Sequence, residues 1–411
     1  MTLTTPDTSV LLDRFGEVRR MTERLASPLS PEDQTAQSMP DASPTKWHRA
    51  HVTWFFEEFL LGPTGGYEPF NPTFGYLFNS YYEAIGPRHP RPDRGLVTRP
   101  SAAEIGRYRE YVDRAVADVV NAGLDDAQCE VLELGINHEQ QHQELLVMDA
   151  LHLLSGHPFA PEMLQRPVED DPASDPVSWR SVEGGLHVIG HDGQGFAYDN
   201  ETGRHRVWLE PFQIAERAVT NADWLAFIED DGYSRSEFWL SDGWAAMQQH
   251  GWQAPGYWSS HDGQWVAFGT GGSRPVRRAE PVAHVSFYEA DAFARWAGAR
   301  LPTEFEWEVA AGGVADARGQ LLDPTRLHPG LAGHHMVGDV WEWTSSAYLP
   351  YPGFQPVEGA IGEYNGKFMS DQHVLRGASC ATPAGHERLT YRNFFPGGSR
   401  WAFSGLRLAR S

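Results

Sequence analysis

Residues 137–144 read NHEQQHQE, and two histidines in this stretch, His138 and His142, lie four positions apart. Side chains four apart in a helix project from the same face, one turn from each other, so both imidazoles can reach one metal ion. A candidate third imidazole lies far upstream, at His51 in the run WHRAHVTWFFE (47–57). Three imidazoles leave one side of an ion open to substrate, an arrangement typical of catalytic metal sites.

The sequence around these histidines has the hydrophobic spacing of helices. Apolar residues recur every three or four positions in 11–25, in 105–119 and in 127–155. The aromatic-rich segment around His51 is a fourth candidate helix. Four amphipathic helices predict a bundle, and helical bundles build metal sites from side chains that face inward.

A stretch with several prolines and glycines, 62–100, separates the second and third predicted helices. Connections of this length inside a compact domain are usually functional or disordered. This one carries NSYYE (79–83) and RHPRPDR (88–94), a dense group of tyrosines and arginines. We interpret it as a loop that lines the site.

An acidic, proline-punctuated segment, 169–176, has the composition of a linker. After it the chain changes to short strand-like runs with many glycines and tryptophans. The clearest segments are two strands, 185–190 and 205–209, and two helices, 220–230 and 286–297. The sequence therefore predicts an α+β protein with two domains, 1–165 and 166–411.

The composition excludes several classes of partner. The chain has 411 residues and a formal net charge of −22, which would repel nucleic acids and anionic membranes. No apolar run is long enough to span a membrane, and the first seven residues lack the features of a signal peptide. Two cysteines, Cys129 and Cys380, cannot form a disulfide framework. We expect a soluble, cytoplasmic protein with no nucleic-acid or membrane partner.

Both halves of the chain resemble known families. The helical half, with its spaced histidines, resembles the DinB-like four-helix bundles. The C-terminal half resembles the formylglycine-generating-enzyme (sulfatase-modifying-factor) domain, a variant of the C-type lectin fold. The matching runs there are VTNA (219–222), PVAHVS (281–286), RLPTEFEWE (300–308), GDVWEW (338–343), LRGAS (375–379) and GLRLA (405–409). Trp307, Trp341, Trp343 and Glu304 are expected to build the core of this domain.

The order of the two domains is similar to that of the ergothioneine-type sulfoxide synthases, or hercynine oxygenases. The resemblance implies a non-haem iron(II) enzyme that uses O2 to join hercynine (Nα-trimethylhistidine) to a thiol donor. It also implies that His51, His138 and His142 are the iron ligands, because His48 does not match the ligand position of the family motif. His48 is then a helix-surface residue or a donor behind the ligands.

The resemblance also implies roles around the metal. Gln141 would hydrogen-bond the imidazole of hercynine. Tyr81 and Tyr82 would supply, as a pair, a phenol that donates a proton to an iron-bound oxygen species. Apart from the resemblance, Arg88, Arg91 and Arg94 are interpreted as residues that hold carboxylates, since a guanidinium matches a carboxylate in a bidentate way. One of the three is expected to make structural ion pairs only.

In the C-terminal domain we expect Trp401 or Phe403 to face the trimethylammonium through a cation–π contact and Asn393 to hold the substrate carboxylate. Two departures concern the donor. Cys380 stands where the family has a tryptophan, and Phe403 stands where relatives that use γ-glutamylcysteine have an aspartate. The departures favour a smaller donor, either cysteine or a selenosugar, and a selenosugar donor would make the protein a selenoneine synthase. Formylglycine generation needs a pair of cysteines and is not supported.

Two further functions remain alternatives. DinB-like bundles also serve as zinc-dependent thiol transferases, and imidazole ligands alone do not select iron over zinc. A lectin-like domain can also act as a ligand-binding module without catalysis.

Overall fold

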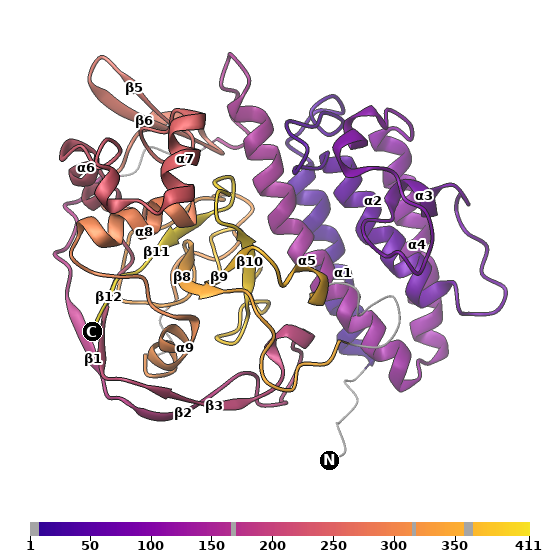
Figure 1. The fold of residues 1–411 in the computed structure, drawn as a ribbon. Coiled ribbons are helices and arrows are strands. Elements are labelled where there is room, and N and C mark those ends of the chain that lie inside the picture. Colours follow the sequence, from indigo (N-terminus) through magenta and orange to yellow (C-terminus); the bar gives the residue numbers. More distant parts are fainter. Residues whose placement is uncertain (1–7, 166–169, 315–317, 357–364) are drawn as a thin grey trace. The chain divides into compact units, whose positions relative to one another are not determined.

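We analysed a computed structural model that describes residues 8–165, 170–314, 318–356 and 365–411. The described chain divides into two compact units, the first ending at Phe159 and the second beginning at Ala160. The first is made of helices, and the second combines short strands with helices (Figure 1). Helices and strands are therefore both present, as the sequence predicts.

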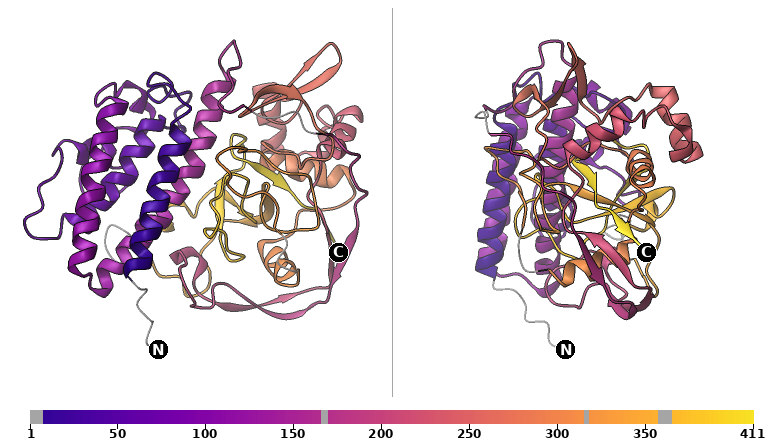
Figure 2. Two further views of the ribbon diagram at one scale, coloured as in Figure 1. Left: turned by 180° about the vertical axis from the view of Figure 1, so that it is seen from behind. Right: turned by 90° about the vertical axis from the view of Figure 1, so that its left-hand side faces the viewer.

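Four long helices pack side by side in the first unit, as both figures show (Figures 1 and 2). They are α1 (Thr8–Ala26), α2 (Thr45–Phe56), α4 (Ala102–Ala122) and α5 (Asp126–Ser155). Each coincides with a segment whose hydrophobic spacing predicts a helix. The four-helix bundle expected from the sequence is thus present.

Local sequence signals set where the two longest helices begin. The side chain of Ser101 accepts a hydrogen bond from Glu104 N (3.2 Å) at the start of α4. At the start of α5, Asp125 accepts from Gln128 N (2.8 Å) while the Gln128 side chain accepts from Asp125 N (3.0 Å). These bonds satisfy backbone N–H groups that the first helical turn leaves without partners.

The 62–100 connection is more regular than its composition indicates. It contains a short helix, α3 (Phe74–Phe78), and a 3₁₀ turn, η2 (Arg91–Leu96), while a π-helical turn, η1 (Glu57–Leu61), extends α2. Phe74 and Phe78 are buried, and the Phe74 ring lies 5.0 Å from that of Tyr108 on α4. Packing against the bundle stabilises α3, although its five residues are too few for a periodic signal.

The described part of the second unit contains twelve short strands and four helices. The strands are β1 (Trp179–Val182), β2 (Gly185–Ile189), β3 (His205–Leu209), β4 (Phe212–Ala215), β5 (Trp258–His261), β6 (Gln264–Gly269), β7 (Gly272–Pro275), β8 (Trp341–Ala347), β9 (Gln372–Arg376), β10 (Asn393–Pro396), β11 (Ser404–Leu406) and β12 (Ala409–Arg410). They form sheets in the orders β10-β9-β8-β11, β1-β4-β12 and β5-β6-β7, and the pair β2-β3. The helices are α6 (Asn221–Glu229), α7 (Ser241–His250), α8 (Phe287–Trp296) and α9 (Glu304–Gly312), and three 3₁₀ turns are η3 (Asp199–Glu201), η4 (Ser236–Phe238) and η6 (Gly366–Phe368).

The core of the second unit contains the side chains that the sequence analysis assigns to it. Trp307, Trp341 and Trp343 are buried, and so is Glu304. The indole of Trp307 donates to Glu342 (2.6 Å), and Glu304 accepts from Arg392 at 2.8 and 3.0 Å. The buried polar groups are hydrogen-bonded, as is usual in protein interiors.

Other predictions have clear outcomes. The strands expected at 185–190 and 205–209 form the hairpin β2-β3, and the expected helices are α6 and α8. The described part of the predicted linker, 170–176, has no regular secondary structure; Glu169 lies outside the described residues, as does the N-terminal segment 1–7. None of the described helices combines the length and apolar character that crossing a bilayer requires.

Candidate metal centre

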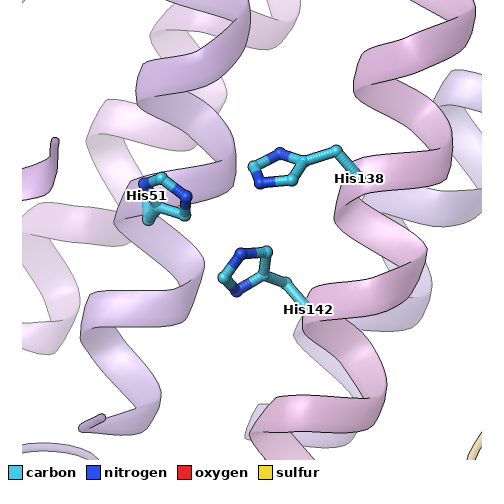
Figure 3. Close-up of side chains that lie close together, drawn as sticks. All are labelled: His51, His138 and His142. Carbon is cyan, nitrogen blue, oxygen red and sulfur yellow. The ribbon is translucent and has the colours of Figure 1, made fainter. Parts of the chain in front are cut away.

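Three histidines from two helices of the first unit point toward a common space (Figure 3). His51 lies on α2, while His138 and His142 lie one turn apart on α5. One nitrogen from each ring can be chosen so that all three atoms lie within 4.8 Å of one another. The ring centroids are 5.0 Å (His51–His138), 4.7 Å (His51–His142) and 4.7 Å (His138–His142) apart.

Burial keeps these imidazoles neutral at physiological pH. His51 and His138 are buried, and His142 is partly exposed. Desolvation lowers the pKa of His138 to about 4. It also lowers the pKa values of His51 and His142 well below 6.5, and the neighbouring His138 adds to the effect on both. A neutral imidazole has a nitrogen lone pair, which a metal ligand needs.

Hydrogen bonding shows which nitrogen of His51 is available. Its Nδ1 lies 2.6 Å from the backbone carbonyl oxygen of Phe78. A carbonyl only accepts, so Nδ1 carries the proton and Nε2 has the lone pair. That Nε2 is buried without a hydrogen-bond partner among the described residues, and so are both ring nitrogens of His138.

Aromatic rings hold the imidazoles in place. Trp47 stacks on His51 with centroids 4.6 Å apart and an interplanar angle of 13°. Trp54, one turn after His51, stacks on it at 5.7 Å, and Phe55 contacts His138 at 4.8 Å. Rings packed in this way restrict the imidazoles to a few rotamers.

These observations fit a bound metal ion. Buried polar atoms in proteins nearly always have partners, so unpartnered nitrogens that converge on one point indicate a missing ligand. Three neutral imidazoles suit iron(II) and zinc equally, and the donor set alone does not separate the two metals.

The structure places the other predicted residues of the first unit as follows. Gln141 is half-buried on α5, directly before His142. The rings of Tyr81 and Tyr82 lie 4.7 Å apart, and Tyr82 lies 5.7 Å from Trp54, the residue that stacks on His51. The tyrosine pair therefore belongs to the aromatic shell that adjoins the histidines.

The three arginines differ in their surroundings. Arg88 forms an exposed ion pair with Glu83, and Arg91 donates to the backbone oxygen of Asp41. Arg94 is buried, with its guanidinium carbon 3.4 Å from the centre of the Trp47 ring. No carboxylate among the described residues forms an ion pair with Arg94, whose pKa burial lowers well below its usual value. Of the cluster, Arg88 is the one that has an ion-pair partner.

Four predicted substrate residues lie in the second unit, which we describe by itself. Phe403 and Cys380 are buried, and the Phe403 ring lies 4.9 Å from His284. Asn393 and Trp401 are half-buried. Asn393 begins β10, and Trp401 contacts Phe395 on the same strand at 5.6 Å.

Asp149 was not predicted from the sequence, and for His48 two alternatives were given, a helix-surface residue or a donor behind the ligands. His48 is buried, so the alternative that it lies on a helix surface is wrong. Its Nδ1 lies 2.9 Å from Nδ1 of His142, and its Nε2 lies 3.0 Å from Oδ2 of Asp149. Asp149 follows His142 by seven residues, two helical turns, and that spacing is the signal that could have identified it.

Comparison with protein families supports the two-part organisation. Residues 14–157 match the DinB superfamily. Residues 165–323 and 328–411 match the sulfatase-modifying factor enzyme 1-like domain. These matches confirm the fold class that the sequence resemblance implies.

Curated relatives match almost the whole chain. Hercynine oxygenase of Mycolicibacterium thermoresistibile is 33% identical over 439 residues, covering 98% of this chain and 95% of the relative. Hercynine oxygenase of Mycolicibacterium smegmatis is 33% identical, covering 97% and 98%. Formylglycine-generating enzyme of Streptomyces coelicolor is 33% identical but covers only 51% of this chain and 82% of its own length. The chain therefore belongs to the hercynine oxygenase family and is an oxygenase enzyme.

Proposed function

We propose that this oxygenase is an iron(II)- and O2-dependent sulfoxide synthase that joins hercynine to a thiol donor, cysteine, in ergothioneine biosynthesis. The observation that carries the proposal is the convergence of three neutral imidazoles, of which His51 and His138 have buried nitrogens with no hydrogen-bond partner in the described parts of the chain. Relatives named hercynine oxygenase support hercynine as the substrate.

The reaction balances with O2 as its only oxidant. A C–H bond of the hercynine imidazole and the S–H bond of the donor break, and a C–S bond forms. One oxygen atom ends on sulfur as the sulfoxide, and the other leaves as water. Iron(II), held by His51, His138 and His142, would supply the activation of O2.

The residues of the chain supply placement and protons. Gln141 directly precedes His142 on α5, and by resemblance its amide would hydrogen-bond the imidazole of hercynine. A phenol of the Tyr81–Tyr82 pair is a neutral proton donor at physiological pH and would protonate the developing oxygen products. Arg88 and Arg91 are exposed cations suited to hold substrate carboxylates once their present partners are displaced.

The second unit would contribute to substrate choice. Asn393 and either Trp401 or Phe403 would bind hercynine, and by resemblance Cys380 adjoins the donor. Cys380 and Phe403 are both buried and carry no charge at neutral pH in their usual forms, so they favour a small donor over γ-glutamylcysteine, which has an extra carboxylate.

The test is reconstitution of the full chain with iron(II) under anaerobic conditions, followed by O2 and a panel of donors with hercynine. We expect O2 consumption and a product whose mass equals hercynine plus cysteine plus one oxygen, less two hydrogens. Tyr81→Phe and Tyr82→Phe, assayed separately and together, would show which phenol acts. Gln141→Leu should raise KM for hercynine while the metal stays bound.

The donor panel also decides between the alternatives. A product formed only with a selenosugar would make the enzyme a selenoneine synthase, the alternative that Cys380 and Phe403 leave open. Activity with zinc and without O2 consumption would instead identify a thiol transferase. Hercynine binding without any turnover would point to a binding protein, contradicting the proposal.

A further inference from the structure

One of the three proposed ligands, His142, belongs to a series of hydrogen bonds that continues to His48 and Asp149, two residues with no role in the proposed function. Nδ1 of His142 lies 2.9 Å from Nδ1 of His48, and Nε2 of His48 lies 3.0 Å from Oδ2 of Asp149. The same Oδ2 accepts from the backbone N–H of Ser43 (2.7 Å). His48 and Asp149 are both buried, so bulk water does not compete for these bonds.

The carboxylate sets the position of every proton in this series of hydrogen bonds. An ionised carboxylate only accepts hydrogen bonds, so Nε2 of His48 must carry the proton that it shares with Asp149. In a neutral ring, Nδ1 of His48 then has the lone pair and accepts. The proton between the two imidazoles therefore belongs to Nδ1 of His142. This leaves the lone pair of His142 on Nε2.

His51 reaches the same tautomer by a different route. Its Nδ1–H donates to the carbonyl oxygen of Phe78 at 2.6 Å, which leaves the lone pair on Nε2. One histidine is thus fixed by a backbone carbonyl and the other by a carboxylate that acts through a second imidazole. Neither ring nitrogen of His138 has a hydrogen-bond partner among the described residues.

We propose that His48 and Asp149 are positioning residues that hold His142 in the tautomer and orientation in which Nε2 binds the metal. The proposal rests on the metal site of the proposed function and adds two residues to it. Partners of this kind orient a ligand ring and raise its basicity, and their loss typically weakens metal binding by about 10–100-fold.

His48 is not itself available as a ligand in this arrangement. Both of its ring nitrogens are hydrogen-bonded, one to His142 and one to Asp149. Binding a metal through either nitrogen would break one of these hydrogen bonds and leave a buried polar group without its partner, which is unfavourable. The geometry therefore distinguishes the two histidines of α2: His51 has a bare Nε2, and His48 does not.

Arg94 completes the surroundings of the carboxylate. It donates from Nη1 to Oγ of Ser43 (2.9 Å), the residue whose backbone N–H binds Asp149. The positive charge of Arg94 is also electrostatically coupled to Asp149. Ser43 therefore links Arg94 to the carboxylate that accepts from His48, and these contacts hold Asp149 in place.

Two matched pairs of variants test the proposal in the full-length protein. His48→Phe keeps a planar ring but removes both hydrogen bonds, whereas His48→Gln retains a donor and an acceptor on one amide. Asp149→Leu removes the acceptor, whereas Asp149→Asn retains an oxygen at the same place. His328→Phe, which breaks the 2.8 Å contact between His328 and Glu280 in the second unit, is the control for the loss of a histidine–carboxylate pair.

The readout is the affinity for iron(II) and for cobalt(II), titrated anaerobically against a competing chelator, together with the visible spectrum of the cobalt form. We expect His48→Phe and Asp149→Leu to bind about 10–100-fold more weakly, with an altered cobalt spectrum. His48→Gln and Asp149→Asn should stay closer to the wild type, and His328→Phe should match it. Thermal unfolding of the metal-free variants identifies any that fail to fold.

Several outcomes would overturn the proposal. Wild-type affinity and spectrum in folded His48→Phe and Asp149→Leu would show that these hydrogen bonds do not position His142. Tighter metal binding by folded His48→Phe than by His48→Gln would show that the ring, and not its hydrogen bonds, matters. The measurement needs neither hercynine nor O2, so a wild type that binds metal but fails to oxidise hercynine would refute the proposed function alone.

Discussion

Two buried polar clusters lie on adjacent residues of α5 and have opposite character. Glu139 has every oxygen hydrogen-bonded: Oε1 to Thr22 (2.6 Å) and Arg109 (2.9 Å), and Oε2 to Arg19 (2.9 Å). His138, the residue before it, has both ring nitrogens buried without a partner among the described residues. The satisfied cluster joins helices to one another, whereas the unsatisfied one is complete only with a ligand.

The ionisation of Glu139 follows from its partners. Burial by itself would raise the pKa of this carboxyl, but Arg19 and Arg109 outweigh that effect and hold the pKa at about 2. For the three histidines burial outweighs the opposing effects, which are that of Glu139 on the pKa of His138 and that of the Phe78 carbonyl on the pKa of His51, so the rings stay neutral. Complete pairing therefore indicates a structural role, and convergent unpaired nitrogens indicate a binding role.

The largest effect should come from the unsatisfied cluster. His138→Ala should abolish iron binding and turnover together, because the ion loses one of three ligands. The free energy of unfolding of the metal-free protein should change little, since His138 makes no hydrogen bond that would be lost. Metal content by elemental analysis, O2 consumption and urea unfolding measure the three quantities. Retained turnover would refute the ligand assignment.

The satisfied cluster should respond in the opposite way. Glu139→Gln leaves the buried Arg19 and Arg109 without the carboxylate that they share, and should lower the free energy of unfolding by about 3 kcal/mol. The cobalt spectrum of the folded variant should match that of the wild type. Urea unfolding and cobalt titration of the same samples test both statements. A change confined to the metal spectrum would reverse the roles of the two clusters.

The sequence predicted those parts of the clusters whose residues lie close together in the chain, and not those whose residues are distant in the chain. The spacing of His138 and His142 is local, so the sequence alone placed them on one helix face. The participation of His51 came from family resemblance, because no local rule brings α2 against α5. The contacts of His48, Asp149 and the Phe78 carbonyl depend on tertiary packing and were not predicted.

The same distinction explains the outcome for the fold. Long amphipathic segments such as 105–119 and 127–155 are correctly predicted, because their periodicity extends over several turns. The five-residue helix α3 and the short strands β5 to β7 carry no such signal. They form because packing and strand pairing stabilise them, and both depend on residues distant in the sequence.

A buried histidine of the second unit, His284, adds a further case to this comparison. Nδ1 of His284 also has no hydrogen-bond partner among the residues that the structure describes, but its ring neighbours are Tyr257 at 4.7 Å and Phe403 at 4.9 Å. Burial lowers its pKa to about 3, although backbone hydrogen bonds act in the other direction. An unpartnered nitrogen therefore marks a metal site only where other ligands converge with it.

The lowered pKa of His284 should make the free energy of unfolding depend on pH. The unfolded chain takes up a proton near pH 6.5, whereas the folded chain does so only near pH 3, so stability is lost as pH falls between these values. The loss should be about 1.4 kcal/mol per pH unit in the middle of the window. His284→Asn should remove this contribution and leave those of the other buried histidines, and asparagine suits the backbone, because His284 has φ +62°. Unfolding at pH 7 and pH 5 is the measurement; parallel curves for the two proteins would contradict it.

The smallest effect should come from an exposed pair. Glu83→Gln removes the partner of Arg88 at the surface, where ion pairs contribute only about 0–1 kcal/mol. Stability should therefore change by less than in Glu139→Gln. If Arg88 holds a substrate carboxylate, releasing it from Glu83 should lower KM for that substrate. Thermal unfolding and steady-state kinetics check the two expectations, and a raised KM would count against the role of Arg88.

The hydrogen bond that Nδ1 of His51 donates is accepted by the main-chain oxygen of Phe78 and not by a side chain. Substitution at position 78 would leave that oxygen in place as long as the new side chain still fills the core. Inserting or deleting residues between α2 and α3 would displace this oxygen from His51. The residue types of this segment can therefore change more freely than its length. A residue-by-residue comparison of relatives would overlook the requirement that the main-chain oxygen of residue 78 stay in place.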